Sequence, residues 1–148
     1  ELANAEESVH FAMFFFTDNV LSARLVERAE SGVVVNGLFD QLGEAGNGSD
    51  ADALCAAGGH IGVEDFAGKL HHKFAIIDAY GSDPTVILGS YNWTDSGAYQ
   101  NDENTLIVHS AALAHDYLAE WQQLWQAIDL DDICNPPTVY LPLILRTV

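Results

Sequence analysis

Polar side chains with catalytic chemistry flank two short apolar segments in the middle of the chain. Residues 74–77 and 86–88 are bounded by turn residues and have the length of buried strands. Four polar residues lie at their ends: His71, Lys73, Ser90 and Asn92. Because successive strand side chains point to opposite faces, we expect His71 and Lys73 on one face and His72 on the other. The same alternation pairs Ser90 with Asn92, so two adjacent strands would bring these four groups to one place.

This set of groups suits an anionic ligand, above all a phosphate. Lys73 and Asn92 can offer charge and hydrogen bonds to phosphate oxygens, and His71 can attack phosphorus or move a proton near neutral pH. A zinc site made by His71, His72 and Asp78 is the main competing interpretation. It is disfavoured because adjacent strand histidines diverge and Lys73 would place a positive charge beside the metal. A solvated strand end with incidental histidines is the other alternative.

The spacing of these residues is that of a known motif. The pattern H-x-K-x4-D runs from His71 to Asp78, G-S-Y-N-W follows at residues 89–93, and Glu103 lies downstream. Because these three features occur together and in this order, the chain resembles the phospholipase D superfamily, which has an H-K-D signature and a G-S-x-N extension. The resemblance extends from about residue 7 to residue 125. It is nearest to single-motif members such as the small bacterial endonucleases.

The resemblance implies a mechanism without a metal ion or other cofactor. His71 of one protomer would attack phosphorus and form a phosphohistidine intermediate, while His71 of the partner subunit would protonate the leaving oxygen and then activate water. Lys73 and Asn92 would offset the charge on the phosphoryl group.

Three further residues receive roles from the same resemblance. Ser90 would add a hydrogen bond to the phosphate or to the frame of the site. Glu103 would accept from the second nitrogen of His71 and fix its tautomer, although one acidic residue among 22 can fall at this spacing by chance. Asp78 belongs to the signature but has the opposite strand parity from His71. We therefore expect it to be a structural carboxylate that binds backbone or a neighbouring side chain.

The chain contains one H-K-D motif and no internal repeat. In the superfamily two motifs face each other across a two-fold axis, from one long chain or from two short ones. The resemblance therefore implies a homodimer with a shared active site, and a self-complementary two-fold pairing is the commonest oligomer.

The surrounding pattern predicts an α/β fold. A strand at 8–16, a helix capped by Thr17 or Asp18 and ended by Gly32, and a strand from Val33 form a β-α-β unit, which favours parallel strands. The resemblance implies a phospholipase D-like mixed, mostly parallel sheet flanked by helices on both faces. Residues 41–50 are expected to form a loop.

The C-terminal part of the chain divides into a helix and a tail. Ser110 is expected to cap a last helix with a broad apolar stripe, which we interpret as core. Asn135-Pro136-Pro137 would break the chain after it. We therefore expect a catalytic domain over 1–135 and a tail over 136–148.

The charge balance is strongly acidic. Five Lys and Arg residues stand against 22 Asp and Glu, for a formal net charge of −17. Such a surface aids solubility, including in high salt, and repels polyanions. The two lysines, Lys69 and Lys73, both lie at the motif.

The two cysteines and the ends of the chain each allow more than one interpretation. Cys55 and Cys134 are either two buried free thiols or a disulfide that joins the C-terminal part to the second helix, which an exported protein would permit. A secreted or cell-surface setting is favoured over a cytoplasmic one. No apolar stretch is long enough for a transmembrane segment, and the absence of an initiator Met suggests a processed protein or an excised domain.

Three functions fit these observations. The short single-motif format favours a nuclease-like phosphodiesterase, which we place first. The acidic charge favours the alternative, a phospholipase D-type hydrolase or transphosphatidylase acting on phospholipid headgroups. A non-catalytic half-domain of a larger protein is the third, and the intact set of motif residues argues against it.

Overall fold

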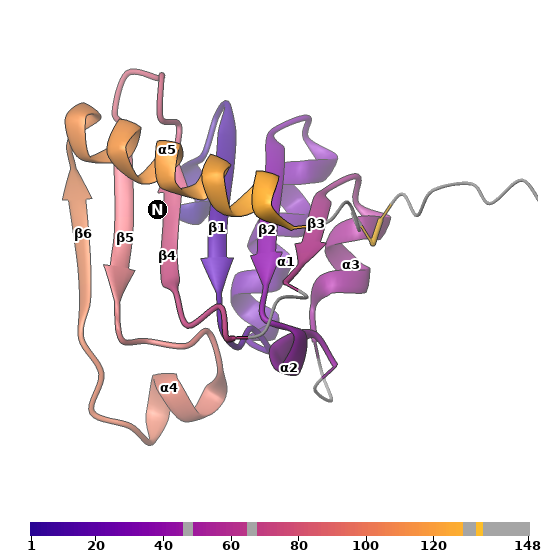
Figure 1. Cartoon of the computed structure of the whole chain (residues 1–148). Helices are drawn as coiled ribbons and strands as arrows, with labels where there is room; N and C mark the ends of the chain where they lie inside the picture. Colours follow the sequence, from indigo (N-terminus) through magenta and orange to yellow (C-terminus); the bar gives the residue numbers. More distant parts are fainter. Residues whose placement is uncertain (46–48, 65–67, 129–132, 135–148) are drawn as a thin grey trace, which may run out of the picture.

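The computed structural model describes residues 1–45, 49–64, 68–128 and 133–134. Its centre is a six-stranded sheet in the order β3-β2-β1-β4-β5-β6 (Figure 1). The strands are β1 (Ser8–Met13), β2 (Val34–Phe39), β3 (His60–Val63), β4 (Lys73–Ile77), β5 (Thr85–Gly89) and β6 (Thr105–His109). The predicted domain end at 135 and the tail 136–148 lie outside the described residues.

The sheet is mixed, as predicted, but parallel strands do not predominate. β1 pairs with β2 and β2 with β3 in parallel, whereas the pairs β1–β4, β4–β5 and β5–β6 are antiparallel. The expectation of a mostly parallel sheet is therefore wrong. The reason is that helical crossovers join β1 to β2 and β2 to β3, whereas β4 and β5 are joined by a short turn, which gives antiparallel neighbours.

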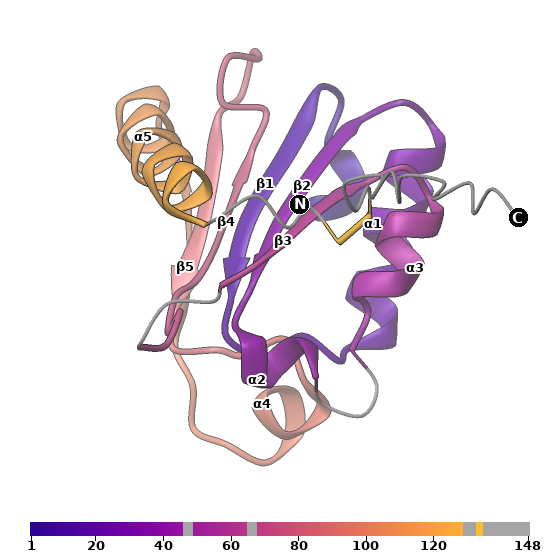
Figure 2. The same ribbon diagram turned by 45° about the vertical axis from the view of Figure 1, so that its right-hand side comes forward.

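Helices cover both faces of the sheet, which confirms the layered α/β arrangement. α1 (Asn19–Glu30) and α3 (Ala51–Ala56) lie on one face, and α5 (Ala111–Ala127) crosses the other (Figure 2). The short elements are η1 (Leu2–Asn4), α2 (Gln41–Glu44) and α4 (Asp95–Tyr99). The first four residues of the predicted loop 41–50 thus form α2, which Asp40 caps through its side chain.

Two of the predicted helix boundaries depend on local chemistry. The Asp18 carboxylate caps α1 by accepting from the backbone N–H groups of Val20 and Leu21, at 2.9 and 3.1 Å. Gly32 follows the helix with φ of 94°, a left-handed conformation that favours glycine.

Each face of the sheet has its own apolar core. Phe11, Phe16, Phe39 and Trp93 are buried between the sheet and α1 and α3. Phe74, Ile76, Leu118 and Trp121 are buried between the sheet and α5. The predicted α5 stripe is therefore core, and the Trp121 indole N–H also donates to the Phe11 carbonyl at 2.8 Å.

Cys55 and Cys134 form a disulfide with a Cα–Cα distance of 4.9 Å. Of the two alternatives, the crosslink is confirmed, and it ties α3 to the segment that follows α5. Among the helices of the described residues, none has both the length and the apolar character needed to cross a bilayer.

Candidate active site

The predicted motif residues meet where β4 begins and β5 ends. The two strands are antiparallel, with Phe74 opposite Leu88, so the residues before Phe74 lie near those after Leu88. Lys73 also pairs with Met13, the last residue of β1. Three strand ends therefore meet at one place in the sheet, as Figure 1 shows for the lower ends of β1, β4 and β5.

His71 and Lys73 are in direct contact. The Lys73 Nζ atom lies 3.3 Å from each ring nitrogen of His71 and 3.1 Å from its carbonyl oxygen. Both residues pack on Phe14, with 4.7 Å between the two ring centroids and 5.2 Å from Nζ to the Phe14 centroid. Burial lowers the pKa of the Lys73 ammonium, and the negative charge of Glu103 opposes this shift. A phosphoryl group at this position would meet the imidazole and the ammonium together.

Ser90 and Glu103 form a second polar pair at the same strand ends. The Ser90 hydroxyl donates to one carboxylate oxygen of Glu103, and Asn101 Nδ2 donates to the other at 3.0 Å. These hydrogen bonds, and then the charge of Lys73, lower the pKa of Glu103. Asn104 makes two further hydrogen bonds to Ser90. The Asn104 side-chain oxygen accepts from the Ser90 N–H at 2.8 Å, and the Asn104 backbone N–H donates to the Ser90 hydroxyl at 3.1 Å.

The expected hydrogen bond between Glu103 and His71 is not present among the described residues. Glu103 instead orients Ser90 and acts on Lys73 through its charge. Sequence reasoning missed Asn101 and Asn104, although both lie beside Glu103 in the chain.

Asn92 follows Ser90 in the segment between β5 and α4. Its neighbour Trp93 is buried, and the Trp93 carbonyl accepts from the N–H groups of Thr17 and Asp18 at 2.8 and 3.0 Å. These two hydrogen bonds fix the backbone next to Asn92. The Asn92 Oδ1 atom is buried and accepts no hydrogen bond from any of the residues that the structure describes.

Asp78 lies at the opposite end of β4 from His71. Its carboxylate accepts from the N–H groups of Glu6, Glu7 and Ser8, each at 2.8 Å. Asp78 therefore ties the start of β1 to the end of β4, which is the structural role expected of it.

The geometry also decides against the zinc alternative. A five-residue strand separates His71 from Asp78, which corresponds to roughly 17 Å. Within the described residues, no three His, Cys, Asp or Glu side chains gather as a metal site.

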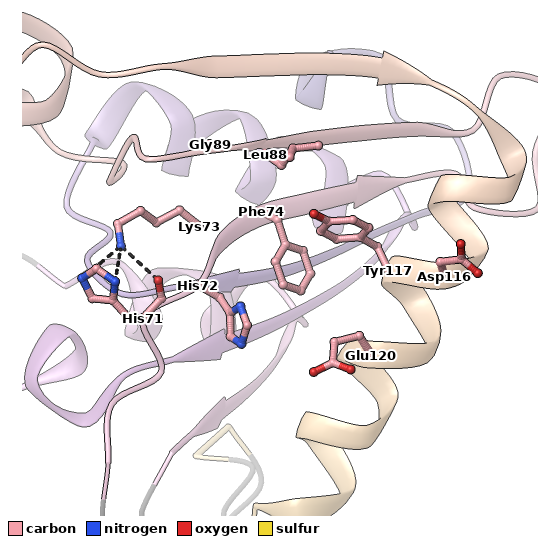
Figure 3. A pocket seen from close by; sticks show the side chains of 9 residues that line it. All are labelled: His71, His72, Lys73, Phe74, Leu88, Gly89, Asp116, Tyr117 and Glu120. Atoms are coloured by element: carbon pink, nitrogen blue, oxygen red, sulfur yellow. Dashed lines mark hydrogen bonds between the residues drawn. The ribbon is translucent and has the colours of Figure 1, made fainter.

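A pocket of about 510 Å³ adjoins the motif on the α5 side of the sheet (Figure 3). His72 faces into it, as the strand alternation predicts, and its ring packs edge-on against Phe74 at 5.5 Å. Burial lowers the pKa of His72, and the charge of Glu120 opposes this shift. Asp116 and Glu120 line the far side of the pocket from α5, and no motif in the sequence marks them.

Two buried carboxyl groups hold the backbone immediately before His71. Asp40 and Glu64 are 1% and 2% exposed, and both accept from the N–H of Leu70, at 2.9 and 3.3 Å. Burial, and then a hydrogen bond with Asp40, raises the pKa of Glu64. The position of His71 therefore depends on carboxyl groups that directly follow β2 and β3.

Comparison with known proteins places this geometry among related folds. The family profile described as "Cardiolipin synthase, PLD-like domain" matches residues 1–125. The chain is 31% identical over 128 residues to the mitochondrial cardiolipin hydrolase of Xenopus tropicalis, covering 86% of this chain and 59% of that protein. It is 30% identical over 121 residues to a phospholipase D of Rickettsia bellii, covering 82% and 58%. The chain thus spans somewhat under three fifths of the length of these relatives.

Solved structures share the fold. Nuc from Salmonella typhimurium, described as a phospholipase D family member, superposes with a TM-score of 0.78 at 26% identity, covering 84% of this chain and 82% of that one. NucT from Helicobacter pylori superposes with a TM-score of 0.75 at 20% identity, covering 86% and 84%.

Proposed function

The chain belongs to the PLD-like domain family of the phospholipase D superfamily of phosphodiesterases, and on this premise we propose that it hydrolyses phosphodiesters through a phosphohistidine on His71. The observation that carries the proposal is the meeting of the His71–Lys73 pair and the Ser90–Glu103 pair at one set of strand ends. A nucleophile, a cation and an ordered hydroxyl are the groups that phosphoryl transfer needs.

In the proposed first step, a ring nitrogen of His71 attacks phosphorus. An N–P bond forms, the P–O bond to the leaving alcohol breaks, and the protonated His71 of the partner subunit gives its proton to the departing oxygen. In the second step, that neutral histidine takes a proton from water, whose oxygen attacks phosphorus and breaks the N–P bond. Lys73 and Asn92 bind the phosphoryl oxygens in both steps.

A homodimer is part of this proposal because a single motif supplies only one histidine for two tasks. His71 is exposed, so it is accessible to a second subunit. Glu103 contributes indirectly, since it orients the Ser90 hydroxyl and keeps a negative charge near Lys73.

Two substrate classes remain for the site. The small single-motif format and the fold similarity to Nuc support nucleic acid. The names of the sequence relatives and the net charge of −17 support a phospholipid, since nucleic-acid binding ordinarily depends on several Lys and Arg contacts to phosphates. A nuclease with this charge should bind at least as well in high salt as in low salt, because salt screens its acidic surface.

The test of the chemistry is hydrolysis of bis(p-nitrophenyl) phosphate with and without a chelator. Wild type should be active in both, and His71→Ala should lose all measurable activity. His109→Asn is the matched control, because His109 lies at the far end of β6 and binds Asp83 and Thr85 there. A phosphoryl group trapped on His71 in an alkaline quench would support the intermediate. Activity that disappears in chelator and returns with a divalent ion would refute the mechanism.

The shared site is tested by mixing subunits. Heterodimers of wild type and His71→Ala should be largely inactive, because each site needs both histidines. Light scattering that shows an active monomer at the assay concentration would rule out the shared site.

A further inference from the structure

Phe14 lies outside the motif, yet it contacts the proposed nucleophile and both lysines of the chain. The centroid of its ring lies 4.7 Å from that of the His71 ring, 5.2 Å from Lys73 Nζ and 5.7 Å from Lys69 Nζ. An ammonium group within about 6 Å of an aromatic centroid is attracted by the negative face of the ring. In a chain with a net charge of −17, both lysines therefore gather on one aromatic side chain.

Two contacts fix the backbone of Phe14. Its N–H donates to the His72 carbonyl at 3.0 Å, which continues the pairing of β1 with β4 past the last strand residue. Gly43 of α2 packs on the Phe14 carbonyl so closely that a Cβ at that position would overlap the oxygen. The half-buried ring of Phe14 therefore stands on a backbone that is held by both β4 and α2.

The His71–Lys73 contact creates a charge problem that such a ring can offset. When the neutral imidazole attacks phosphorus through one nitrogen, the other nitrogen keeps its proton, so the His71 ring gains a positive charge. Lys73 Nζ lies 3.3 Å from each nitrogen of that ring, so the two positive charges would repel each other. Burial also lowers the pKa of the Lys73 ammonium. An electron-rich ring beside both groups favours the positive charge on each of them.

We propose that Phe14 is a positioning residue, which holds the Lys73 ammonium beside His71 and stabilises the positive charge that develops on the imidazole during attack. The part of the inference that concerns attack rests on the proposed phosphodiesterase function. The alternative is that Phe14 only fills space next to the site. In that case the size of the ring would matter, and its electron density would not.

The test replaces Phe14 by phenylalanine analogues with one, two or three fluorine atoms on the ring. Fluorine withdraws electron density from the face of the ring and changes its size little. The release of the first p-nitrophenolate from bis(p-nitrophenyl) phosphate, measured in a single turnover with excess enzyme, reports the attack of His71. Its rate constant should fall stepwise with the number of fluorine atoms, to about one tenth of the wild-type value with three.

The same analogues at Phe15 are the matched control. Phe15 is also half-buried and its ring packs on Phe14 at 4.4 Å, but among the described residues neither lysine lies over it. Fluorination at Phe15 should leave the rate constant within about twofold of wild type. A rate that does not respond to fluorine at Phe14, or that falls as much with fluorine at Phe15, would overturn the assignment.

A double-mutant cycle in urea unfolding separates this inference from the proposed reaction. The variants are Phe14→Leu, Lys73→Met and the two together. If the ring attracts the ammonium, the combined change should alter the unfolding equilibrium constant by about two- to fivefold less than the product of the two single changes. The cycle with Phe15→Leu in place of Phe14→Leu should show no such coupling.

The two experiments together distinguish the possible failures. If wild type hydrolyses no phosphodiester but the coupling between Phe14 and Lys73 is found, the proposed function fails and the positioning of Lys73 by Phe14 stands. If wild type hydrolyses the ester while the fluorine trend and the coupling are both absent, the phosphodiesterase stands and the role of Phe14 is refuted.

Discussion

The buried pair Asp40 and Glu64 offers a direct test of how the fold positions His71. Both carboxyl groups accept from the Leu70 N–H, and Asp40 also accepts from the Leu42 N–H at 2.9 Å. Because burial and the hydrogen bond with Asp40 raise the pKa of Glu64, we expect Glu64 to hold a proton and donate it to the Asp40 carboxylate. The two residues are therefore not equivalent.

Two conservative substitutions should have different effects. Glu64→Gln keeps a neutral donor toward Asp40, so we expect the free energy of unfolding at pH 7 to stay within about 1 kcal/mol of wild type or to rise. Asp40→Asn replaces an acceptor of two backbone N–H groups with an amide that has one oxygen. One of the two backbone N–H groups then loses its Asp40 acceptor, and a hydrogen bond to a charged carboxylate is lost, which should cost about 2–4 kcal/mol.

The pH dependence of the unfolding free energy is a second, independent test of the proton on Glu64. A carboxyl group whose pKa is raised by folding contributes stability fully below its unfolded pKa of about 4.3, and this contribution is lost as pH rises through the folded pKa. Gln does not titrate, so the unfolding free energy of Glu64→Gln should fall less than that of wild type between pH 4 and pH 8.

Urea unfolding followed by tryptophan fluorescence measures both effects, and hydrolysis of bis(p-nitrophenyl) phosphate reports whether His71 has moved. Asp40→Asn should lose activity even where it is folded, because Leu70 directly precedes His71. Equal pH slopes for wild type and Glu64→Gln would refute the assigned proton. Greater damage from Glu64→Gln than from Asp40→Asn would place that proton on Asp40.

Three further predictions follow from local geometry. Gly89→Ala should lose most of the activity, because an added Cβ would overlap the Asn104 carbonyl oxygen and displace the residue that holds Ser90; a fully active variant would contradict this. Reduction of the Cys55–Cys134 bond, which closes a separation of 79 residues, should lower the free energy of unfolding by about 2–4 kcal/mol in denaturant titrations, and an unchanged midpoint would be inconsistent with the crosslink. His10 is partly buried and its pKa is lowered to about 4, so its contribution to stability should be lost as pH falls from about 6.5 to below 4; NMR titration of its ring should show no protonation at pH 5.5.

The acidic surface also affects how the substrate is reached. With five basic residues in the chain, a long nucleic-acid strand would have few cations to contact beyond the motif. The comparison of nucleic acid with phospholipid as the substrate is therefore the measurement that separates the two substrate classes.

Local features of the site and fold could be predicted from the sequence. Strand alternation put His71 and Lys73 together and turned His72 to the other face, and both are observed. Asp18 and Ser110 cap their helices as the sequence predicts, because a cap depends on residues within one turn. These relations involve neighbours in the chain, and the covalent backbone determines them.

Relations between elements required the tertiary structure. The sequence did not indicate that Glu103 would bind Ser90 instead of His71, because that choice depends on the antiparallel pairing of β5 with β6. Nor did it place Asp116 and Glu120 at the pocket, because the position of α5 is set by how its buried stripe packs on the sheet. Periodicity in a sequence reports which face of an element is buried, whereas the packing of the whole core decides which other element that face meets.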